Sequence, residues 1–203
     1  MRILTIADEE SKALWDHFRP GTLKGVDLIL SCGDLDPDYL QFLVTMANCP
    51  LLYVRGNHDE VYDRRPPLGC TSVEDRIYRC NGLRILGLGG SMRYKEGPFQ
   101  YQPKEMEKRV SKLKKKIAEE GGLDILVTHA PVAGYGDRQD RAHQGFEAFD
   151  TLLRTCRVRY LIYGHVHKEY GAFERVNVHP SGTFLINGYL SCFLDTETGK
   201  IDE

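Results

Sequence analysis

The sequence predicts an α/β protein, and three features of the chain point to that class. Short apolar runs rich in β-branched residues alternate with segments of helical periodicity. A Gly-Gly pair ends the longest of the helical segments, and polar residues follow directly after several of the apolar runs. We expect one domain over residues 1–203, because a chain of this length can bury a core without disulfides.

The first part of the chain alternates predicted strands and predicted helices. Residues 2–7, 26–32 and 51–54 are apolar and rich in strand-forming residues. Residues 10–18 and 37–47 lie between them and are predicted helices. This β-α-β-α-β order favours a parallel sheet, because each helix carries the chain back to the edge where the preceding strand began.

The middle of the chain is predicted to contain a hairpin, a loop and a long helix. Residues 77–88 form two strands that turn at Asn81-Gly82, a pair that suits a tight hairpin turn. Residues 91–103 are rich in Gly, Pro, Tyr and Gln and have no periodicity, which predicts a surface loop. Apolar residues then recur at steps of three and four, which predicts a helix over residues 104–120.

The second half of the chain continues this alternation. A strand is predicted from Leu123 to Thr128, followed by a polar loop over residues 133–145 and a helix that ends near Thr155. The next strand covers residues 160–163, and two or three short strands follow up to Leu194.

Composition excludes several classes of protein. The chain carries 27 Lys and Arg against 29 Asp and Glu, a net charge of -2 that gives no general attraction to nucleic acid. No apolar run reaches the roughly 18 residues of a membrane helix, and the N-terminus lacks the pattern of a signal peptide. The six cysteines form no C-x-x-C pair, which favours reduced thiols in a cytoplasmic protein. The oligomeric state stays open.

Carboxylate, amide and imidazole side chains follow five of the predicted strands. Open α/β sheets bind ligands at the carboxyl ends of their strands, so we expect these side chains to converge. They are Asp8 and Glu10, Asp34, Asn57 and His58, His129, and His165 with His167. Oxygen and nitrogen donors without a thiolate suit Mn, Fe, Zn or Mg.

The motifs Gly33-Asp34, Gly56-Asn57-His58-Asp59, a lone His129 and Gly164-His165-Val166-His167 resemble the signature of the calcineurin-like metallophosphoesterases. The resemblance implies a two-sheet β-sandwich flanked by helices, in the layer order α-β-β-α. The segment that follows Gly164 is most similar to the small intracellular branch of the family, which has phosphodiesterase activity of the cyclic-nucleotide type.

The same resemblance implies a centre with two divalent metal ions, of which Mn is the favoured metal. Asp34 would bridge the ions; Asp8 and His167 would hold the first; the second would be held by Asn57, His129 and His165. The implied reaction is the hydrolysis of a phosphoester in a small substrate by metal-bound hydroxide. Two ions suit this reaction because they clamp the phosphate and make a water acidic.

Other residues near these motifs are predicted to act on the substrate. Besides binding metal, Asn57 would contact the substrate, and His58 would protonate the leaving oxygen or steady the phosphoryl charge. Arg55 would add a positive contact, or it forms a structural ion pair. His143, in the polar loop, would lie over the substrate, or it is an exposed loop histidine.

Two positions depart from the family pattern. Glu10 stands where the family has histidine; it either binds the first metal, in which case Glu10→Ala lowers bound metal, or begins a helix facing solvent. Pro37 stands where the family has the aspartate that orients the catalytic histidine. Asp36 is predicted to cap the helix that Pro37 begins. Asp59 is therefore the better candidate for charge support of His58, and its substitution should cost more rate than substitution of Asp36.

Rival functions remain open. A phosphomonoesterase or protein phosphatase would use the same centre, whereas a nuclease is disfavoured by the absence of a basic stripe. A non-catalytic metal-binding scaffold of the same fold is the rival from another class. The two departures from the family pattern argue for it, and the retained histidines argue against it.

Overall fold

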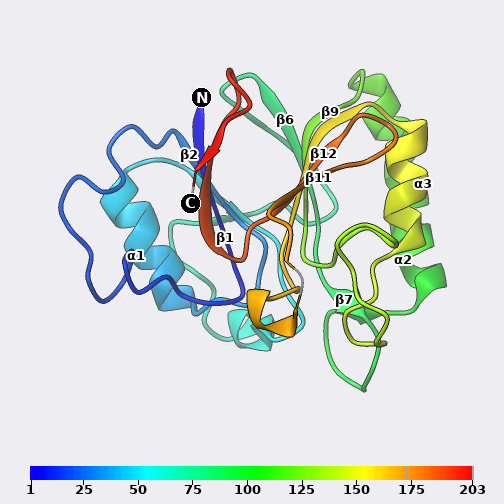
Figure 1. Cartoon of the computed structure of the whole chain (residues 1–203), viewed down its shortest axis with the longest axis horizontal. Coiled ribbons are helices and arrows are strands. Elements are labelled where there is room, and N and C mark those ends of the chain that lie inside the picture. Colours follow the sequence, from blue (N-terminus) through cyan, green and yellow to red (C-terminus); the bar gives the residue numbers. More distant parts are fainter. Residues whose placement is uncertain (172, 203) are drawn as a thin grey trace.

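Two large β-sheets face each other, and helices cover both outer faces. The computed structural model describes residues 1–171 and 173–202. Figure 1 shows the four layers in order: one helix, the first sheet, the second sheet and a pair of helices. The predicted α/β class and the α-β-β-α arrangement are both confirmed.

The first sheet has six strands and is largely parallel. Its order is β14 (Ile201–Asp202), β13 (Leu190–Asp195), β1 (Arg2–Ala7), β2 (Leu28–Ser31), β3 (Leu51–Tyr53) and β4 (Thr71–Ser72). Strands β1 to β4 run parallel, and β13 and β14 add antiparallel pairs at one edge. Helix α1 (Pro37–Ala47) lies on the outer face of this sheet.

The second sheet also has six strands, with a parallel centre and antiparallel edges. Its order is β11 (Val176–Val178), β12 (Phe184–Asn187), β10 (Val158–Tyr163), β9 (Leu123–Thr128), β6 (Leu83–Leu88) and β5 (Ile77–Cys80). Helices α2 (Pro103–Glu119) and α3 (Glu147–Thr155) cover its outer face. The short elements are β7 (Ser91–Met92), β8 (Gln100–Tyr101), and the 3-10 helices η1 (Asp59–Asp63) and η2 (Lys168–Tyr170).

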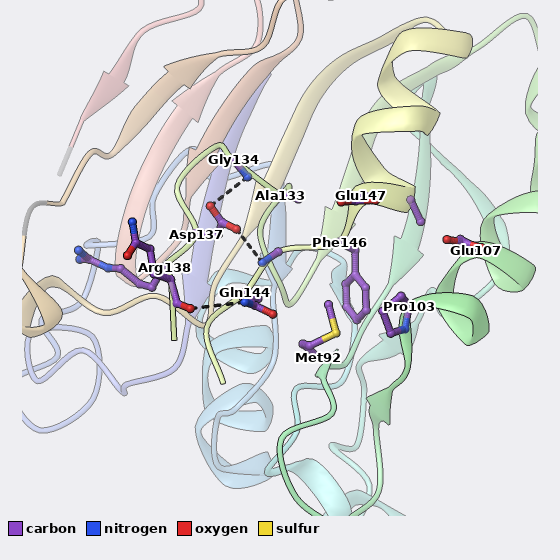
Figure 2. Close-up of a pocket in the computed structure, with 13 residues that line it drawn as sticks. Met92, Pro103, Glu107, Ala133, Gly134, Asp137, Arg138, Gln144, Phe146 and Glu147 are labelled. Carbon is purple, nitrogen blue, oxygen red and sulfur yellow. Dashed lines mark hydrogen bonds between the residues drawn. The ribbon is translucent and has the colours of Figure 1, made fainter. Parts of the chain in front are cut away.

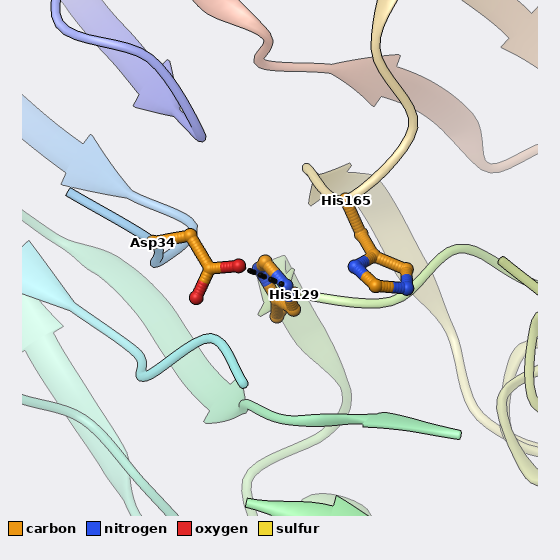
Figure 3. Close-up of side chains that lie close together, drawn as sticks. All are labelled: Asp34, His129 and His165. Carbon is orange, nitrogen blue, oxygen red and sulfur yellow. Dashed lines mark ion pairs between the residues drawn. The ribbon is translucent and has the colours of Figure 1, made fainter. Parts of the chain in front are cut away.

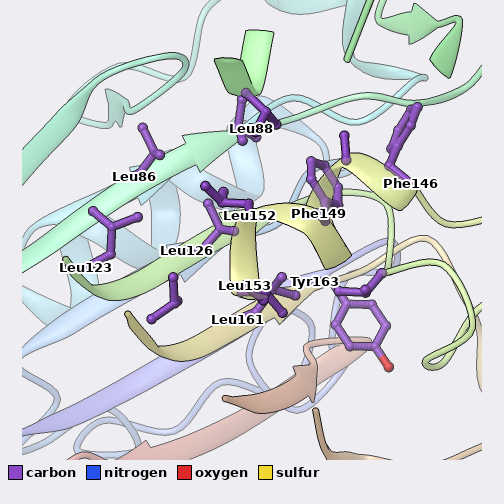
Figure 4. Packing of buried hydrophobic residues seen from close by; sticks show 14 of the residues in the cluster. Leu86, Leu88, Leu123, Leu126, Phe146, Phe149, Leu152, Leu153, Leu161 and Tyr163 are labelled. Carbon is purple, nitrogen blue, oxygen red and sulfur yellow. The ribbon is translucent and has the colours of Figure 1, made fainter. Parts of the chain in front are cut away.

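The apolar residues form three clusters, one at each junction between layers. Figure 4 shows the cluster in which α3 packs on the second sheet, with Phe149 and Leu152 facing Leu126. Helix α2 joins this cluster through Met106, Val110, Leu113 and Ile117, all of them buried. Those four residues form the stripe whose three- and four-residue spacing predicted the helix.

Most of the predicted elements are confirmed. Helix α1 spans residues 37–47, with the Asp36 side chain accepting a hydrogen bond from the Asp38 amide at 2.8 Å as its N-cap. The β5–β6 hairpin turns at Asn81 and Gly82, whose φ angles of 47° and 83° are the left-handed values that a type I′ turn requires.

Two expectations were wrong in part. Residues 12–17, inside the segment predicted as a helix over 10–18, form successive turns. Trp15 and Phe18 pack edge-on against α1, with ring centroids of 5.1 to 5.4 Å to Tyr39 and Phe42, and this packing outweighs the local helical periodicity. The predicted loop over 91–103 contains the two-stranded parallel sheet of β7 and β8.

In the part of the chain that the structure describes, every helix is too short or too polar to cross a membrane.

Candidate metal centre

Seven of the predicted site residues line a cavity of about 390 Å³ at the carboxyl ends of strands from both sheets. Its lining residues are Asp8, Asp34, Asn57, His58, Tyr94, Ala142, His143, His165, His167 and Tyr170. Residues far apart in the chain meet here because β1 and β2 of the first sheet, and β9 and β10 of the second, run parallel within their sheets.

Three residues of the cavity turn the backbone sharply where their strands end. Asp8, Asp34 and His165 have φ angles of 68°, 57° and 67°, in the left-handed region that residues other than glycine seldom adopt. Such conformations cost free energy and persist where the surrounding structure holds them, typically at functional sites. Here each turn follows a buried strand, and the side chain of the turn residue itself lines the cavity.

Asp34, His129 and His165 lie close together beside the cavity (Figure 3) and are called the centre below. One potential ligand atom from each lies within 4.8 Å of the other two. The Nε2 atom of His129 is 3.3 Å from Asp34 Oδ2 and 3.1 Å from Asn57 Oδ1. The three clustered atoms and the Asn57 oxygen come from four different strand ends, and such a set of oxygen and nitrogen donors suits a divalent cation.

Backbone carbonyl oxygens bond one ring nitrogen of His129 and one of His165. His129 Nδ1 lies 2.8 Å from the carbonyl oxygen of Cys32, and His165 Nε2 lies 2.7 Å from that of Ala142. Because a carbonyl can only accept, each of these nitrogens must carry the hydrogen. In a neutral ring the other nitrogen then has the lone pair that a metal-binding histidine needs. His129 reaches this form by losing the Nε2 proton that it otherwise holds against Asp34.

Asp8 and His167 form a second pair of polar side chains at the cavity. The Asp8 carboxylate accepts the His165 amide at 2.8 and 2.9 Å, and its Oδ1 is 3.8 Å from His167 Nε2. The His167 ring is stacked between Tyr170 and Tyr189, with centroid distances of 4.7 and 4.9 Å. These contacts leave His167 little rotational freedom, so its ring is held in the orientation that faces Asp8.

The Asp59 carboxylate ties the backbone of Asp34 to that of Gly56. The buried Asp59 Oδ2 accepts the amide of Asp34 at 2.8 Å and that of Gly56 at 2.7 Å. Asp34 Oδ1 in turn accepts the His58 amide at 2.8 Å. Asp59 therefore braces two strand-end loops, and among the described residues we find no hydrogen bond between it and the His58 imidazole.

The charges of the centre are strongly coupled. Burial by itself would raise the pKa of Asp34 and lower that of His129, but their mutual attraction outweighs it, so the Asp34 pKa falls to about 2 and the His129 pKa rises to about 9. Burial, together with the charge on His129, lowers the pKa of His165 and keeps that ring neutral. Burial and the Asp34 charge raise the pKa of Asp59 to about 7.

Glu10 and Arg55 are not brought to the cavity. The Glu10 carboxylate accepts the Asp36 amide at 2.8 Å and borders a separate hollow with Trp15. Arg55 forms an ion pair with Asp63 and lies over the Phe99 ring at 4.8 Å, which is the structural role that the sequence left open for it.

The loop over residues 133–145 brings His143 to the cavity, where its ring lies 5.2 Å from that of His165. Tyr94 and Tyr170 also line the cavity and were missed by the sequence analysis. Tyr94 lies in the loop predicted over 91–103, whose aromatic content was the available signal; Tyr170 closely follows the last motif.

A second cavity of about 680 Å³ lies against the same 133–145 loop (Figure 2), lined by Met92, Phe146 and residues of the loop itself. Inside the loop, Asp137 accepts the amides of Gly134 and Gly145, each at 3.0 Å. These bonds close the loop into a compact unit and use both oxygens of the carboxylate.

The two-sheet fold and the cluster of possible metal ligands point to one protein family. The sequence pattern of the calcineurin-like phosphoesterase family matches residues 7–169, so the chain belongs to that family. Two UPF0046 proteins of Caenorhabditis elegans are similar, one 35% identical over 52 residues and the other 27% identical over 122 residues. These matches cover 25% and 57% of this chain but only 13% and 40% of the relatives, so the chain matches less than half the length of either relative.

Solved structures share the fold at low sequence identity. A putative 5′-nucleotidase from Staphylococcus aureus aligns with 99% of this chain and 52% of its own length, at a TM-score of 0.59 and 11% identity. An archaeal phosphodiesterase aligns with 99% of this chain and 97% of its own length, at a TM-score of 0.52 and 13% identity. A hypothetical protein from Thermus thermophilus aligns with 100% of this chain and 97% of its own length, at a TM-score of 0.56 and 16% identity. These likenesses establish the fold.

Proposed function

We propose that this protein is a metal-dependent phosphodiesterase that acts on a small phosphorylated substrate at a dinuclear centre. The observation that carries the proposal is the pair of carbonyl-backed imidazoles, His129 and His165, converging on Asp34 in the cavity. The carbonyl bonds decide which nitrogen of each ring can face the cluster, and proteins commonly orient metal-binding histidines in this way. A cytoplasmic location is part of the proposal, in keeping with six free cysteines.

The donor set fits two divalent ions. Asn57, His129 and His165 would hold one, Asp8 and His167 the other, and the two oxygens of Asp34 are suited to bridging. All donors are oxygen or imidazole nitrogen, which favours Mn and also accepts Fe, Zn or Mg. When bound, such a pair of ions supplies Lewis-acid stabilisation of phosphate charge and an acidified water.

The protein side chains bind and orient the substrate. His58 is exposed at the cavity and its imidazole is free to approach a phosphoryl oxygen, with its own backbone fixed by Asp34. Asn57 would share its amide between metal and substrate. Tyr94 and Tyr170 at the rim offer apolar surface to the organic part of the substrate.

A phosphomonoesterase is the second candidate, because the same donor set can stabilise either transition state. The similar folds include both an archaeal phosphodiesterase, which is named for diester hydrolysis, and a putative 5′-nucleotidase, which is named for monoester hydrolysis. We favour the diester because the archaeal phosphodiesterase aligns over 97% of its own length, whereas the 5′-nucleotidase aligns over 52% of its length.

The test is a substrate comparison on metal-reconstituted protein. Purified protein is stripped with a chelator, reloaded with Mn, and assayed with bis-p-nitrophenyl phosphate and p-nitrophenyl phosphate. We expect Mn-dependent turnover with a higher kcat/KM for the diester, and loss of bound Mn in His129→Ala. A higher kcat/KM for the monoester would select the second candidate. Full metal content with no turnover of either ester would select a non-catalytic scaffold.

A further inference from the structure

Among residues 1–171 and 173–202, we find no carboxylate that bonds the His58 imidazole and would hold it oriented and protonated for acid catalysis. Pro37 stands at the position where the family pattern has an aspartate. Asp36 caps α1, and the bonded oxygen of Asp59 is taken by two backbone amides. Within the described residues, none of these acidic groups bonds the His58 imidazole, so a proton for the leaving group must be sought elsewhere around the cavity.

The 133–145 loop carries a histidine with such a partner. His143 Nδ1 lies 2.8 Å from Asp140 Oδ1, and the His143 amide donates to the same oxygen at 3.2 Å. A carboxylate accepts only, so Nδ1 carries a hydrogen and the ring is fixed about its side-chain bonds. The opposite nitrogen, Nε2, is left on the edge of the ring away from Asp140, and the side chain lines the cavity.

The loop is anchored to the centre itself, so this pair has a defined place relative to it. Ala142, the neighbour of His143, accepts the hydrogen bond from His165 Nε2 at 2.7 Å. The His143 ring also lies 4.6 Å from that of Tyr170, and its side chain is only 23% exposed. Catalytic acids need this kind of fixed placement, because a proton must be delivered to one atom.

From this geometry we infer that His143 is the acid that protonates the leaving oxygen and that Asp140 is its positioning residue. In the step, an oxygen of water forms a bond to phosphorus while the ester P–O bond breaks. The ring enters the step as the imidazolium, with a hydrogen on each nitrogen and Asp140 beside Nδ1. The leaving oxygen takes the bonding pair and the proton from Nε2, which leaves the neutral ring. The proton lost by the attacking water returns to the ring through solvent, so water and diester give monoester and alcohol. The inference rests on the proposed phosphodiesterase activity.

A leaving-group comparison tests it. Methyl p-nitrophenyl phosphate releases a good leaving group that needs little protonation, whereas methyl phenyl phosphate releases a poorer one. Mn-loaded wild type, His143→Asn and Asp140→Asn are assayed with both. We expect His143→Asn to lower kcat about 100-fold on the phenyl ester and less than about 5-fold on the nitrophenyl ester. Asp140→Asn should show the same selectivity at about 10-fold.

Three controls accompany the comparison. Bound Mn is measured in each variant, because the loop also contacts His165. Arg141→Ala changes an exposed side chain of the same loop that does not line the cavity, and should match wild type on both esters. His58→Ala should lower kcat on both esters alike, because a group that steadies phosphoryl charge acts whatever the leaving group.

The outcomes are distinct. Equal losses on both esters in His143→Asn, or none, with Mn content unchanged, would overturn the assignment of the acid while leaving the phosphodiesterase proposal standing. A selective loss in His143→Asn but not in Asp140→Asn would remove Asp140 from the role. Mn-loaded wild type that turns over neither ester would reject the proposed function and the acid together.

Discussion

Gly56 is the position at which one added methyl group should dismantle the metal centre. A Cβ built on Gly56 would lie 2.5 Å from Asp34 Cγ and 2.7 Å from His129 Cε1. Carbon atoms in contact prefer about 3.5 Å or more, so the two ligands would have to retreat by about 1 Å and about 0.8 Å. Metal sites tolerate errors of only about 0.2 Å in ligand distance.

We therefore expect Gly56→Ala to weaken Mn binding about 100-fold, equivalent to about 2.7 kcal/mol at 25 °C. The measurements are Mn titration by calorimetry and bound metal after gel filtration, with circular dichroism to verify folding. Gly188→Ala is the matched control, since its Cβ would meet Tyr163 O at 3.4 Å and Thr5 Oγ1 at 3.6 Å, which are ordinary contacts. A folded Gly56→Ala protein with the Mn affinity of wild type would refute the assignment of Asp34 and His129 as ligands.

Three further experiments test the surroundings of the centre and the stability of the fold. Asp59→Ala leaves the amides of Asp34 and Gly56 without an acceptor and should lower kcat about 10- to 100-fold. Asp36→Ala removes the N-cap of α1 and should lower the free energy of unfolding by about 1 kcal/mol with little change in kcat. A larger loss of kcat in Asp36→Ala than in Asp59→Ala would contradict the bracing role of Asp59. Glu10→Gln keeps an acceptor for the Asp36 amide and should leave bound Mn unchanged, and a fall in Mn content would restore Glu10 as a ligand. The hydrogen bond from Arg84 lowers the pKa of Asp124, so its stabilisation is present above the unfolded pKa of about 3.9 and is lost as pH falls through the lower folded value. Asp124→Asn should accordingly reduce the free energy of unfolding by about 1 kcal/mol at pH 7 in denaturant titrations, and an equal loss near pH 2 would argue against an ionic contribution.

The sequence by itself determined the elements whose cause is local. Helix α2 follows from the spacing of Met106, Val110, Leu113 and Ile117, and the β5–β6 turn follows from the tolerance of Asn81 and Gly82 for left-handed backbone. The order of polar motifs after strands also indicated a shared site, because parallel strands bring their carboxyl ends to one edge.

Tertiary structure alone decided what depends on distant partners. The turns around Trp15 replace the predicted helix because aromatic contacts with α1 outweigh local periodicity. Glu10 and His143 were both open alternatives in the sequence, and their surroundings separate them: the Asp36 amide takes the glutamate, while Asp140 and the Ala142 carbonyl hold the loop of His143 at the cavity. The sequence motifs identify side chains whose chemistry allows them to bind metal or substrate. Hydrogen bonds between residues far apart in the chain decide which of those side chains reach the cavity.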